Sequence, residues 1–125
     1  MSNPFLYVAS AVLGLHGLVH LLGSGVYLGV FELAAFEYQT TLLAGTVDVG
    51  DVGIRVFGLL WAATAIGFAA SAVAVVAEWP RWRILLGAVT GLSLLLTGLA
   101  VEVAYAGFAL NLALLMGMFA VTDSG

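Results

Sequence analysis

Four long apolar stretches account for most of this 125-residue chain. They lie at about residues 4–29, 53–77, 84–103 and 106–121. A helix needs roughly 20 mostly apolar residues to cross the hydrocarbon core of a bilayer. One continuous helix over residues 84–121 is excluded, because at about 1.5 Å per residue it would span nearly twice the thickness of that core. The pattern predicts an all-α integral membrane protein, a four-transmembrane-helix bundle that forms a single domain over residues 1–125.

The composition agrees with a membrane location and excludes several classes of function. Hydrophobic residues make up 63% of the chain and charged residues 8%, whereas about a quarter of the residues in a soluble domain are charged. With three Arg, no Lys and a net charge of −4, the chain lacks the basic surface that a nucleic-acid partner requires. The absence of Cys excludes disulfides, thiolate metal sites and iron–sulfur clusters. An acidic chain without Lys is also typical of a salt-loving, archaeal source.

The connections between the stretches predict how the bundle is oriented. Residues 78–83, with the sequence EWPRWR, form a short loop whose Arg81 and Arg83 favour the cytoplasmic side by the positive-inside rule. Both termini then also lie in the cytoplasm, and the location that we expect is the plasma membrane. The long acidic connection at residues 31–52 lies outside. Its first half, residues 31–42, has the spacing of a short helix that either lies at the interface or continues the first helix.

Small residues recur at a spacing of four, which permits close contact between helix backbones in a membrane. Because lipid tails provide no hydrophobic drive between helices, such contacts favour a compact bundle, and one contact face would be free for self-association. The partners that we expect are therefore the lipid bilayer and either a second copy, in a homo-oligomer, or a larger membrane complex. The motifs are Ser10-x-x-x-Gly14, Gly25-x-x-x-Gly29 and Gly87-x-x-x-Gly91.

His16 and His20 lie near the middle of the first stretch, and their spacing places both on one helix face. A polar side chain at this depth is costly, so intramembrane ionisable residues are candidates for function. Three interpretations remain open. The pair can share a metal ion that takes further ligands from elsewhere. It can contact haem or a quinone, although one helix face cannot supply both axial ligands of a haem. Finally, both imidazoles can be neutral and hydrogen-bond to neighbouring helices.

Polar residues in the outer halves of the four helices predict a pocket that opens to the outer side of the membrane. Since a charge in hydrocarbon costs at least about 2.5 to 3.5 kcal/mol, polar groups at one level should converge rather than face lipid. We expect Arg55 to neutralise Glu102 or an anionic ligand, and the indole N–H of Trp61 to need an acceptor inside the bundle. The predicted ligand-binding residues are His16, His20, Ser24, Tyr27, Arg55, Trp61, Glu102 and Asn111.

Several motifs follow one another in a characteristic order: LHGLVHLLG at residues 15–23, GLLW at residues 58–61, Ser93, and finally Gly107-x-x-x-Asn111-Leu112. In this order they resemble the pattern of a widespread, uncharacterised family of small four-helix prokaryotic membrane proteins. The similarity covers all four helices, and the His-Gly-Leu-x-His-Leu-x-Gly run is its most specific element. The family usually carries an acidic residue and a Lys between helices three and four, where this chain has Val103 and Tyr105. The resemblance implies a shared fold and a shared His pair, and it implies no activity.

Two functions compete. The leading one is a binding or accessory membrane protein whose His pair and outer pocket hold an ion, a small polar ligand or a partner helix. An enzyme is less favoured, because the sequence has no Ser/His/Asp or paired-carboxylate arrangement, phosphate loop or H-E-x-x-H signature. The alternative is a small oligomeric proton-coupled transporter, similar in length and helix count to small multidrug exporters. Those proteins need a carboxylate within helix one, and a His of ordinary pKa near 6.5 could replace it chemically.

Overall fold

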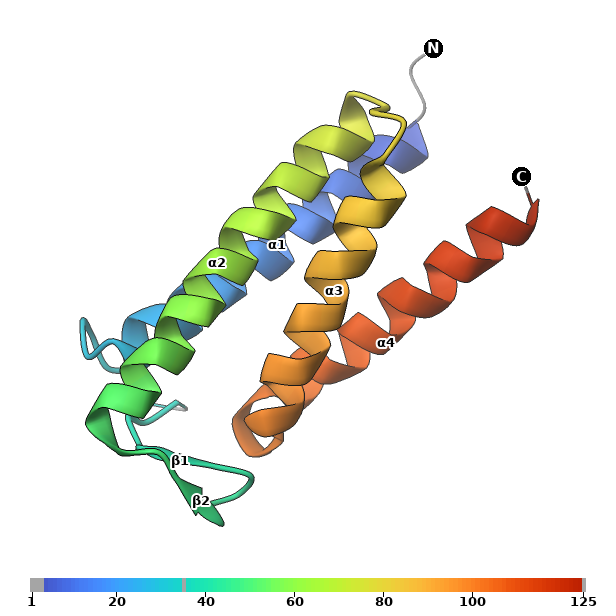
Figure 1. The fold of residues 1–125 in the computed structure, drawn as a ribbon. Coiled ribbons are helices and arrows are strands. Elements are labelled where there is room, and N and C mark those ends of the chain that lie inside the picture. Colours follow the sequence, from blue (N-terminus) through green and yellow to red (C-terminus); the bar gives the residue numbers. More distant parts are fainter. Residues whose placement is uncertain (1–3, 35, 125) are drawn as a thin grey trace.

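The computed structural model describes residues 4–34 and 36–124, and it contains four long helices (Figure 1). A small antiparallel hairpin between α1 and α2 pairs Thr41 with Asp48. Each helix contains a segment that is long and apolar enough to cross a membrane. The prediction of an all-α, four-helix chain is confirmed, and the helices have the length and composition of a multi-pass membrane protein. The elements are α1 (Pro4–Tyr27), β1 (Thr41–Leu42), β2 (Val47–Asp48), α2 (Gly50–Val76), α3 (Trp82–Leu99) and α4 (Val101–Ser124).

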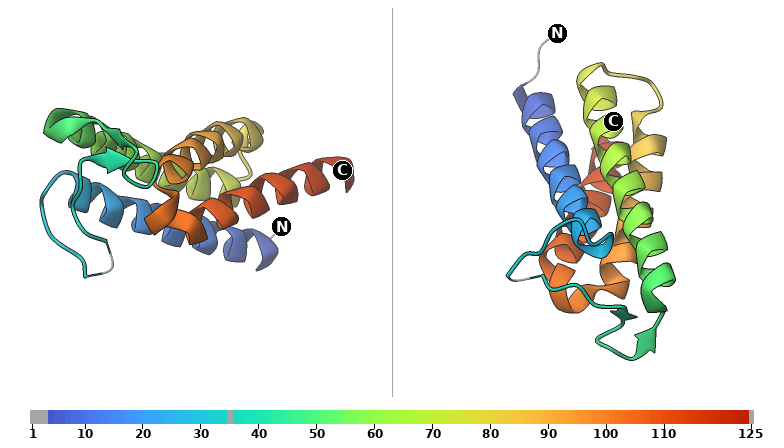
Figure 2. Two further views of the ribbon diagram at one scale, coloured as in Figure 1. Left: turned by 90° about the horizontal axis from the view of Figure 1, so that it is seen from below. Right: turned by 90° about the vertical axis from the view of Figure 1, so that its left-hand side faces the viewer.

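The helices pack in chain order, α1 against α2, α2 against α3, and α3 against α4. The two chain ends and the α2–α3 loop lie at one end of the molecule, which we call the terminal end (Figures 1 and 2). The β-hairpin and the α3–α4 turn lie at the opposite end, called the hairpin end. Helices α3 and α4 diverge toward the C-terminus of α4 (Figures 1 and 2). Of the α4 side chains that the structure describes, Asn111 alone is buried.

Two buried apolar clusters form the core, one toward each end of the bundle. The cluster at the hairpin end contains Tyr27, Leu42, Ile54, Phe57, Trp61, Leu96 and Ala100. The cluster at the terminal end contains Leu13, Phe68, Val75 and Leu86. Along α1, both His residues lie between Leu13 of one cluster and Tyr27 of the other. The two His side chains are therefore held between two layers of packed hydrophobic side chains.

α1 ends at Tyr27, two residues earlier than predicted, because Gly29 adopts a left-handed conformation with φ of 74°. The N–H of Gly29 donates to the carbonyl of Val26 over 3.0 Å, and the N–H of Val30 donates to the carbonyl of Gly25 over 2.8 Å. These two bonds form a Schellman motif, which satisfies the last helical carbonyls and terminates the helix.

Beyond this motif the chain folds back on α1, and the ring of Phe31 lies against Gly25. The prediction of a short helix over residues 31–42 is wrong in the part of this segment that the structure describes. An isolated bridge between Leu33 and Phe36, followed by β1, takes its place. The spacing of apolar residues was compatible with a helix, but the left-handed Gly29 directs the chain away from a helical continuation.

The remaining helix boundaries shift by a few residues. α2 begins at Gly50 instead of residue 53, and α3 covers residues 82–99 instead of 84–103. Two residues of the predicted loop, Trp82 and Arg83, therefore belong to the first turn of α3. Ala100 joins α3 to α4, and Ala104, in the first turn of α4, has the non-helical φ of −114°. α4 consequently starts five residues earlier than predicted, with this kink near its beginning.

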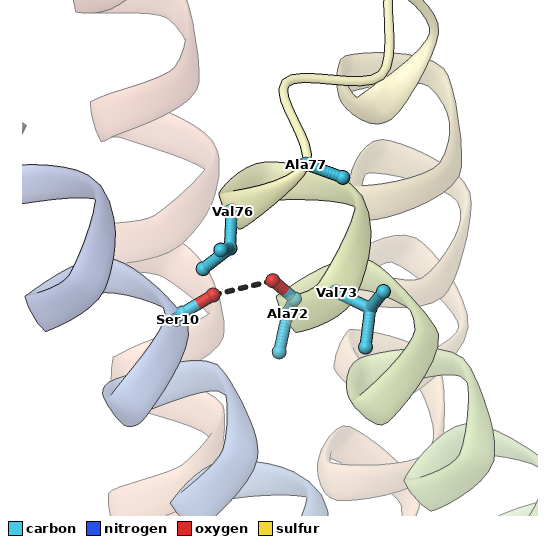
Figure 3. A pocket seen from close by; sticks show the side chains of 5 residues that line it. All are labelled: Ser10, Ala72, Val73, Val76 and Ala77. Carbon is cyan, nitrogen blue, oxygen red and sulfur yellow. Dashed lines mark hydrogen bonds between the residues drawn. The ribbon is translucent and has the colours of Figure 1, made fainter. Parts of the chain in front are cut away.

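The spaced small residues contribute less to packing than predicted. A Cβ at Gly14, Gly29 or Gly91 would have no neighbour within 4 Å, so these three glycines make no close helix contact among the described residues. Ser10 does join two helices, since its hydroxyl donates to the carbonyl of Ala72 in a surface groove between α1 and α2 (Figure 3). Gly87 of the predicted motifs does face α4, since a Cβ there would lie 3.5 Å from Met118. The closer contacts between helices occur at other glycines, among them Gly17, Gly23, Gly58, Gly67 and Gly98.

Candidate functional site

A buried hydrogen-bonded cluster joins α1, α3 and α4, and we call its five side chains the histidine network. Nε2 of His16 lies 2.9 Å from Oδ1 of Asn111. Nδ2 of Asn111 donates to Oγ of Ser93 over 2.7 Å and to Oγ1 of Thr97 over 3.2 Å. Oγ of Ser93 lies 2.7 Å from Nε2 of His20, whose Nδ1 lies 3.0 Å from the carbonyl oxygen of His16. None of the five side chains is more than 4% exposed.

Both His side chains point into the protein, which confirms that they face the bundle interior. Their rings meet edge to face with centroids 4.7 Å apart. The His20 ring also lies 4.9 Å from the ring of Trp61, and the His16 ring lies 4.6 Å from that of Phe68. Aromatic contacts from α2 therefore fix the orientation of each imidazole, while α3 and α4 supply the hydrogen bonds.

The bonding pattern assigns the hydrogen atoms of the network. Oδ1 of Asn111 can only accept, so Nε2 of His16 carries a hydrogen and donates. The carbonyl of His16 can also only accept, so Nδ1 of His20 carries a hydrogen. The hydroxyl of Ser93 accepts from Asn111 and donates to Nε2 of His20. The hydroxyl of Thr97 donates to the carbonyl of Ser93 over 2.8 Å. Both imidazoles are neutral in this arrangement, and they are opposite tautomers.

One nitrogen of the network remains without a partner. Nδ1 of His16 has no hydrogen bond within the described ranges. The fully enclosed polar side-chain atoms without a partner there are Nε1 of Trp61 and Oγ1 of Thr90. Since Nδ1 of His16 is not among them, it retains some accessible surface. The prediction that the Trp61 indole finds an acceptor inside the bundle is wrong for this structure.

A partly enclosed cavity of about 190 Å³ borders the histidine network on the side of the hairpin end. Helix α1 contributes His16 and His20 to its wall, α2 contributes Trp61, α3 contributes Thr97, and α4 contributes Gly107. The segment between α1 and β1 closes it with apolar side chains, and almost all of the wall is apolar. We call this space the His16 cavity. It combines an apolar wall with a few polar atoms, which is typical of sites for small molecules.

Some residues of the predicted pocket line the His16 cavity, and several of its other members lie elsewhere. Of the predicted set, His16, His20 and Trp61 line the His16 cavity, and Asn111 lies behind it in the network. Ser24 donates to the carbonyl of Gly58 over 2.7 Å and so links α1 to α2. Tyr27 is 1% exposed and packs in the aromatic cluster at the hairpin end. Ser24 and Tyr27 therefore stabilise helix packing in this structure.

The ion pair between Arg55 and Glu102 is absent from this structure, so this part of the prediction is wrong, while neutralisation of an anionic ligand by Arg55 stays a prediction. Arg55 lies on the exposed face of α2 and lines a surface pocket of about 450 Å³. Glu102, at the start of α4, accepts hydrogen bonds from Nε2 of Gln39 over 3.3 Å and from the N–H of Ala44 over 3.4 Å. Both residues lie toward the hairpin end as expected. Similar depth along two helices did not bring them to the same face.

The donor set at the His pair is incomplete for a metal ion. No group of three or more His, Cys, Asp and Glu side chains is arranged to bind a metal in the portion of the chain that the structure describes. Nε2 of each imidazole is already engaged in a hydrogen bond. A structural metal site needs four ligands, and a catalytic one needs three. The geometry thus favours the interpretation in which neutral imidazoles bond to neighbouring helices.

Sequence reasoning did not place Ser93 and Thr97 in the site, since hydroxyls in membrane helices usually bond to their own backbone. Thr97 does make such a bond, to the carbonyl of Ser93. Ser93 instead bonds to His20 and Asn111. Their i, i+4 spacing, which matches that of the two His residues, is the signal that could have indicated a shared polar face.

At the hairpin end, exposed polar contacts hold the connection before α2. Asp48 accepts hydrogen bonds from the N–H of Gly50 and the hydroxyl of Thr40, each over 2.9 Å. These two bonds, the one from Gly50 having the larger effect, lower the pKa of Asp48 below its ordinary value. The hydroxyl of Tyr38 donates to Asp51 over 2.6 Å, and this bond raises the pKa of Tyr38.

No model of a known protein family matches the chain, and no curated protein or solved structure is significantly similar to it.

Proposed function

We propose that the protein is a membrane binding protein whose His16 cavity takes up one small, largely apolar molecule of single-ring size. The observation that carries this proposal is the cavity itself, which has a volume of about 190 Å³ and an almost wholly apolar wall. An apolar protein cavity of about 150 Å³ is sufficient to bind benzene. Among the ligands considered from the sequence, an ion or a partner helix fits such a space poorly.

The position of the cavity supports uptake from the lipid phase. Val19 and Leu22 line the cavity and are 56% and 42% exposed on the outer surface of α1. On α4, Ala106 also lines the cavity and is exposed. Because these residues line the cavity and are also exposed at the surface, the cavity opens laterally between α1 and α4 in this proposal. A molecule dissolved in the bilayer could enter by this route without crossing the polar connection at the hairpin end.

The alternative of a proton-coupled transporter is less well supported. In the proposed hydrogen assignment, both imidazoles are neutral and their bonds within the network are made. Toward the terminal end, Phe68 of the apolar cluster lies against the His16 ring, with ring centroids 4.6 Å apart. A transporter needs access from both sides, whereas the described cavity lies on the hairpin side of that cluster.

Trp61 fluorescence tests the proposed binding. The chain has three Trp, so Trp79→Phe together with Trp82→Phe leaves Trp61 as the only Trp, whose emission is excited selectively at the red edge of the absorption band. Titration of this variant with toluene in detergent should give a saturable change in Trp61 emission, because Trp61 forms part of the cavity wall.

A pair of glycine variants provides the control. A Cβ at Gly107 would lie 3.5 Å from Thr97 and 3.7 Å from His16, which is ordinary contact, so Gly107→Ala fits and Gly107→Val extends into the cavity. Toluene affinity should fall progressively in these two variants. Gly14→Ala, where a Cβ meets nothing within 4 Å, should retain it. An emission change that is non-saturable and identical in all variants would contradict the proposal.

The proposed orientation places both termini in the cytoplasm of a cell whose plasma membrane the protein spans. Its support is the pair Arg81 and Arg83 at the terminal end, near the start of α3. Because the chain has no Cys, single substitutions can be labelled without background. Glu37→Cys at the hairpin end should react with an impermeant maleimide from outside, and Trp79→Cys only after permeabilisation. The reverse pattern would contradict this orientation.

A further inference from the structure

We infer that the molecule bound in the His16 cavity is a phenol: an aromatic ring whose hydroxyl donates a hydrogen bond to Nδ1 of His16. This inference rests on the proposed binding function and adds the chemical class of the ligand. It follows from which polar atoms at the cavity wall are already bonded and from the hydrogen that each one carries.

The side-chain polar atoms around the cavity are almost all engaged. His20 uses Nδ1 for the carbonyl of His16 and Nε2 for Ser93. The hydroxyl of Thr97 donates to the carbonyl of Ser93 and accepts from Asn111. The indole N–H of Trp61 has no partner but is fully enclosed, so a ligand in the cavity cannot reach it without rearrangement. Among the polar side-chain atoms of the described residues that line the cavity, this leaves Nδ1 of His16, which has no hydrogen bond and is not fully enclosed.

This nitrogen can act only as an acceptor. Nε2 of His16 donates to Oδ1 of Asn111, so in the neutral ring Nδ1 carries a lone pair. A ligand with a carbonyl oxygen alone, such as a quinone, would place lone pair against lone pair. A hydroxyl donor would satisfy the nitrogen, and the same contact would satisfy the polar group of the ligand inside an apolar site.

The surroundings favour an aromatic donor over water. A buried water normally makes about three hydrogen bonds, and this wall offers one free acceptor. Trp61 and Phe36 line the cavity with aromatic rings, and the His20 ring lies 4.9 Å from that of Trp61. An aromatic ring can make offset or edge-to-face contacts with such a wall. The volume of about 190 Å³ exceeds the volume of about 150 Å³ that is sufficient to bind benzene, which leaves room for a substituted ring.

Matched ligands separate this inference from the proposed function. Using Trp61 emission in the Trp79→Phe/Trp82→Phe variant, p-cresol is compared with toluene, its counterpart without a hydroxyl, and with p-benzoquinone. After correction for partition into detergent, p-cresol should bind about three to ten times more tightly than toluene, as expected for one added hydrogen bond. p-Benzoquinone should bind no more tightly than toluene. Equal affinities for p-cresol and toluene would overturn the phenol inference and leave the binding function intact. If none of the three ligands binds, both the proposed binding function and the phenol inference are contradicted.

A spectroscopic signature tests the contact in the unmodified protein. With ¹⁵N-labelled His, the Nδ1 resonance of His16 should start at the position of an unprotonated nitrogen and move upfield with p-cresol but not with toluene. A p-cresol complex in which this resonance does not move would overturn the inference. His16→Phe should remove the preference for p-cresol. Asn111→Leu also breaks the bond between His16 and Asn111 but keeps the imidazole, so this variant should retain part of the preference. If both variants keep the full preference for p-cresol, the phenol inference is also overturned.

Discussion

Nε2 of His16 donates to Oδ1 of Asn111 over 2.9 Å, and this bond ties α1 to α4 across the interior of the bundle. α4 packs mainly on α3 and diverges from it toward the C-terminus (Figure 1). Asn111 is 0% exposed, whereas most described side chains of α4 remain accessible. The hydrogen bond therefore positions the first half of α4, which supplies Gly107 and its neighbours to the wall of the His16 cavity.

Two hydroxyls of α3 should respond oppositely to removal. Ser93→Ala leaves Nε2 of His20 and one N–H of Asn111 without partners, which should lower the free energy of unfolding by about 1 to 2 kcal/mol. Thr90→Val removes a hydroxyl that is enclosed and unpaired, so stability should stay constant or rise by up to about 1 kcal/mol. Unfolding by SDS measures the change in the free energy of unfolding for each variant. Equal losses for the two variants would contradict the described network.

The two His residues should be opposite neutral tautomers. His16 carries its hydrogen on Nε2 and His20 on Nδ1, because each donates to an oxygen that can only accept. Solid-state NMR of ¹⁵N-labelled His in lipid, near neutral pH, distinguishes the two forms by which nitrogen shows a one-bond coupling to hydrogen. His16→Gln and His20→Gln assign the signals. Two identical tautomers, or an imidazolium at either position, would refute this assignment.

Two glycines of α1 form a matched pair for packing. A Cβ at Gly23 would lie 2.7 Å and 2.8 Å from ring atoms of Trp61, so Gly23→Ala should destabilise the protein by about 1 to 3 kcal/mol and shift Trp61 emission. Gly14→Ala meets open space and should leave stability unchanged or raise it by up to about 1 kcal/mol, because Ala has the higher helix propensity. A Gly23→Ala variant as stable as Gly14→Ala would indicate that Trp61 does not pack on α1.

The hydrogen bonds of Asp48 should stabilise the hairpin end less in acid than at neutral pH. Because the pKa of Asp48 is lower in the folded state than in the unfolded chain, its contribution to stability is present at neutral pH. That contribution is lost as the pH falls through the lowered pKa. Thr40→Val removes one of the two donors and should raise the pKa of Asp48 toward its ordinary value of 3.8. A carboxyl ¹³C titration measures this. An unchanged pKa would show that the Thr40 bond does not form.

Sequence periodicity was sufficient to predict the four helices and the inward direction of the His pair. Length and apolar content set the helices, and the i, i+4 spacing of His16 and His20 set their common face. Periodicity did not predict which side chains bond to one another, because the depth of a residue along a helix does not give its direction around the helix axis. Arg55 and Glu102 illustrate this limit, since both lie toward the hairpin end but bond to different segments. The path after α1 depended on one backbone angle, the positive φ of Gly29.

Intermolecular NOEs can locate a bound single-ring molecule and so test the proposed ligand site most directly. In perdeuterated detergent, the protons of toluene should show NOEs to the Trp61 ring and to the Hα atoms of Gly107, both at the cavity wall. These NOEs should weaken in Gly107→Val and persist in Gly14→Ala. NOEs only to outward residues such as Ile66 and Leu95, which are 71% and 59% exposed, would contradict a ligand site in the His16 cavity.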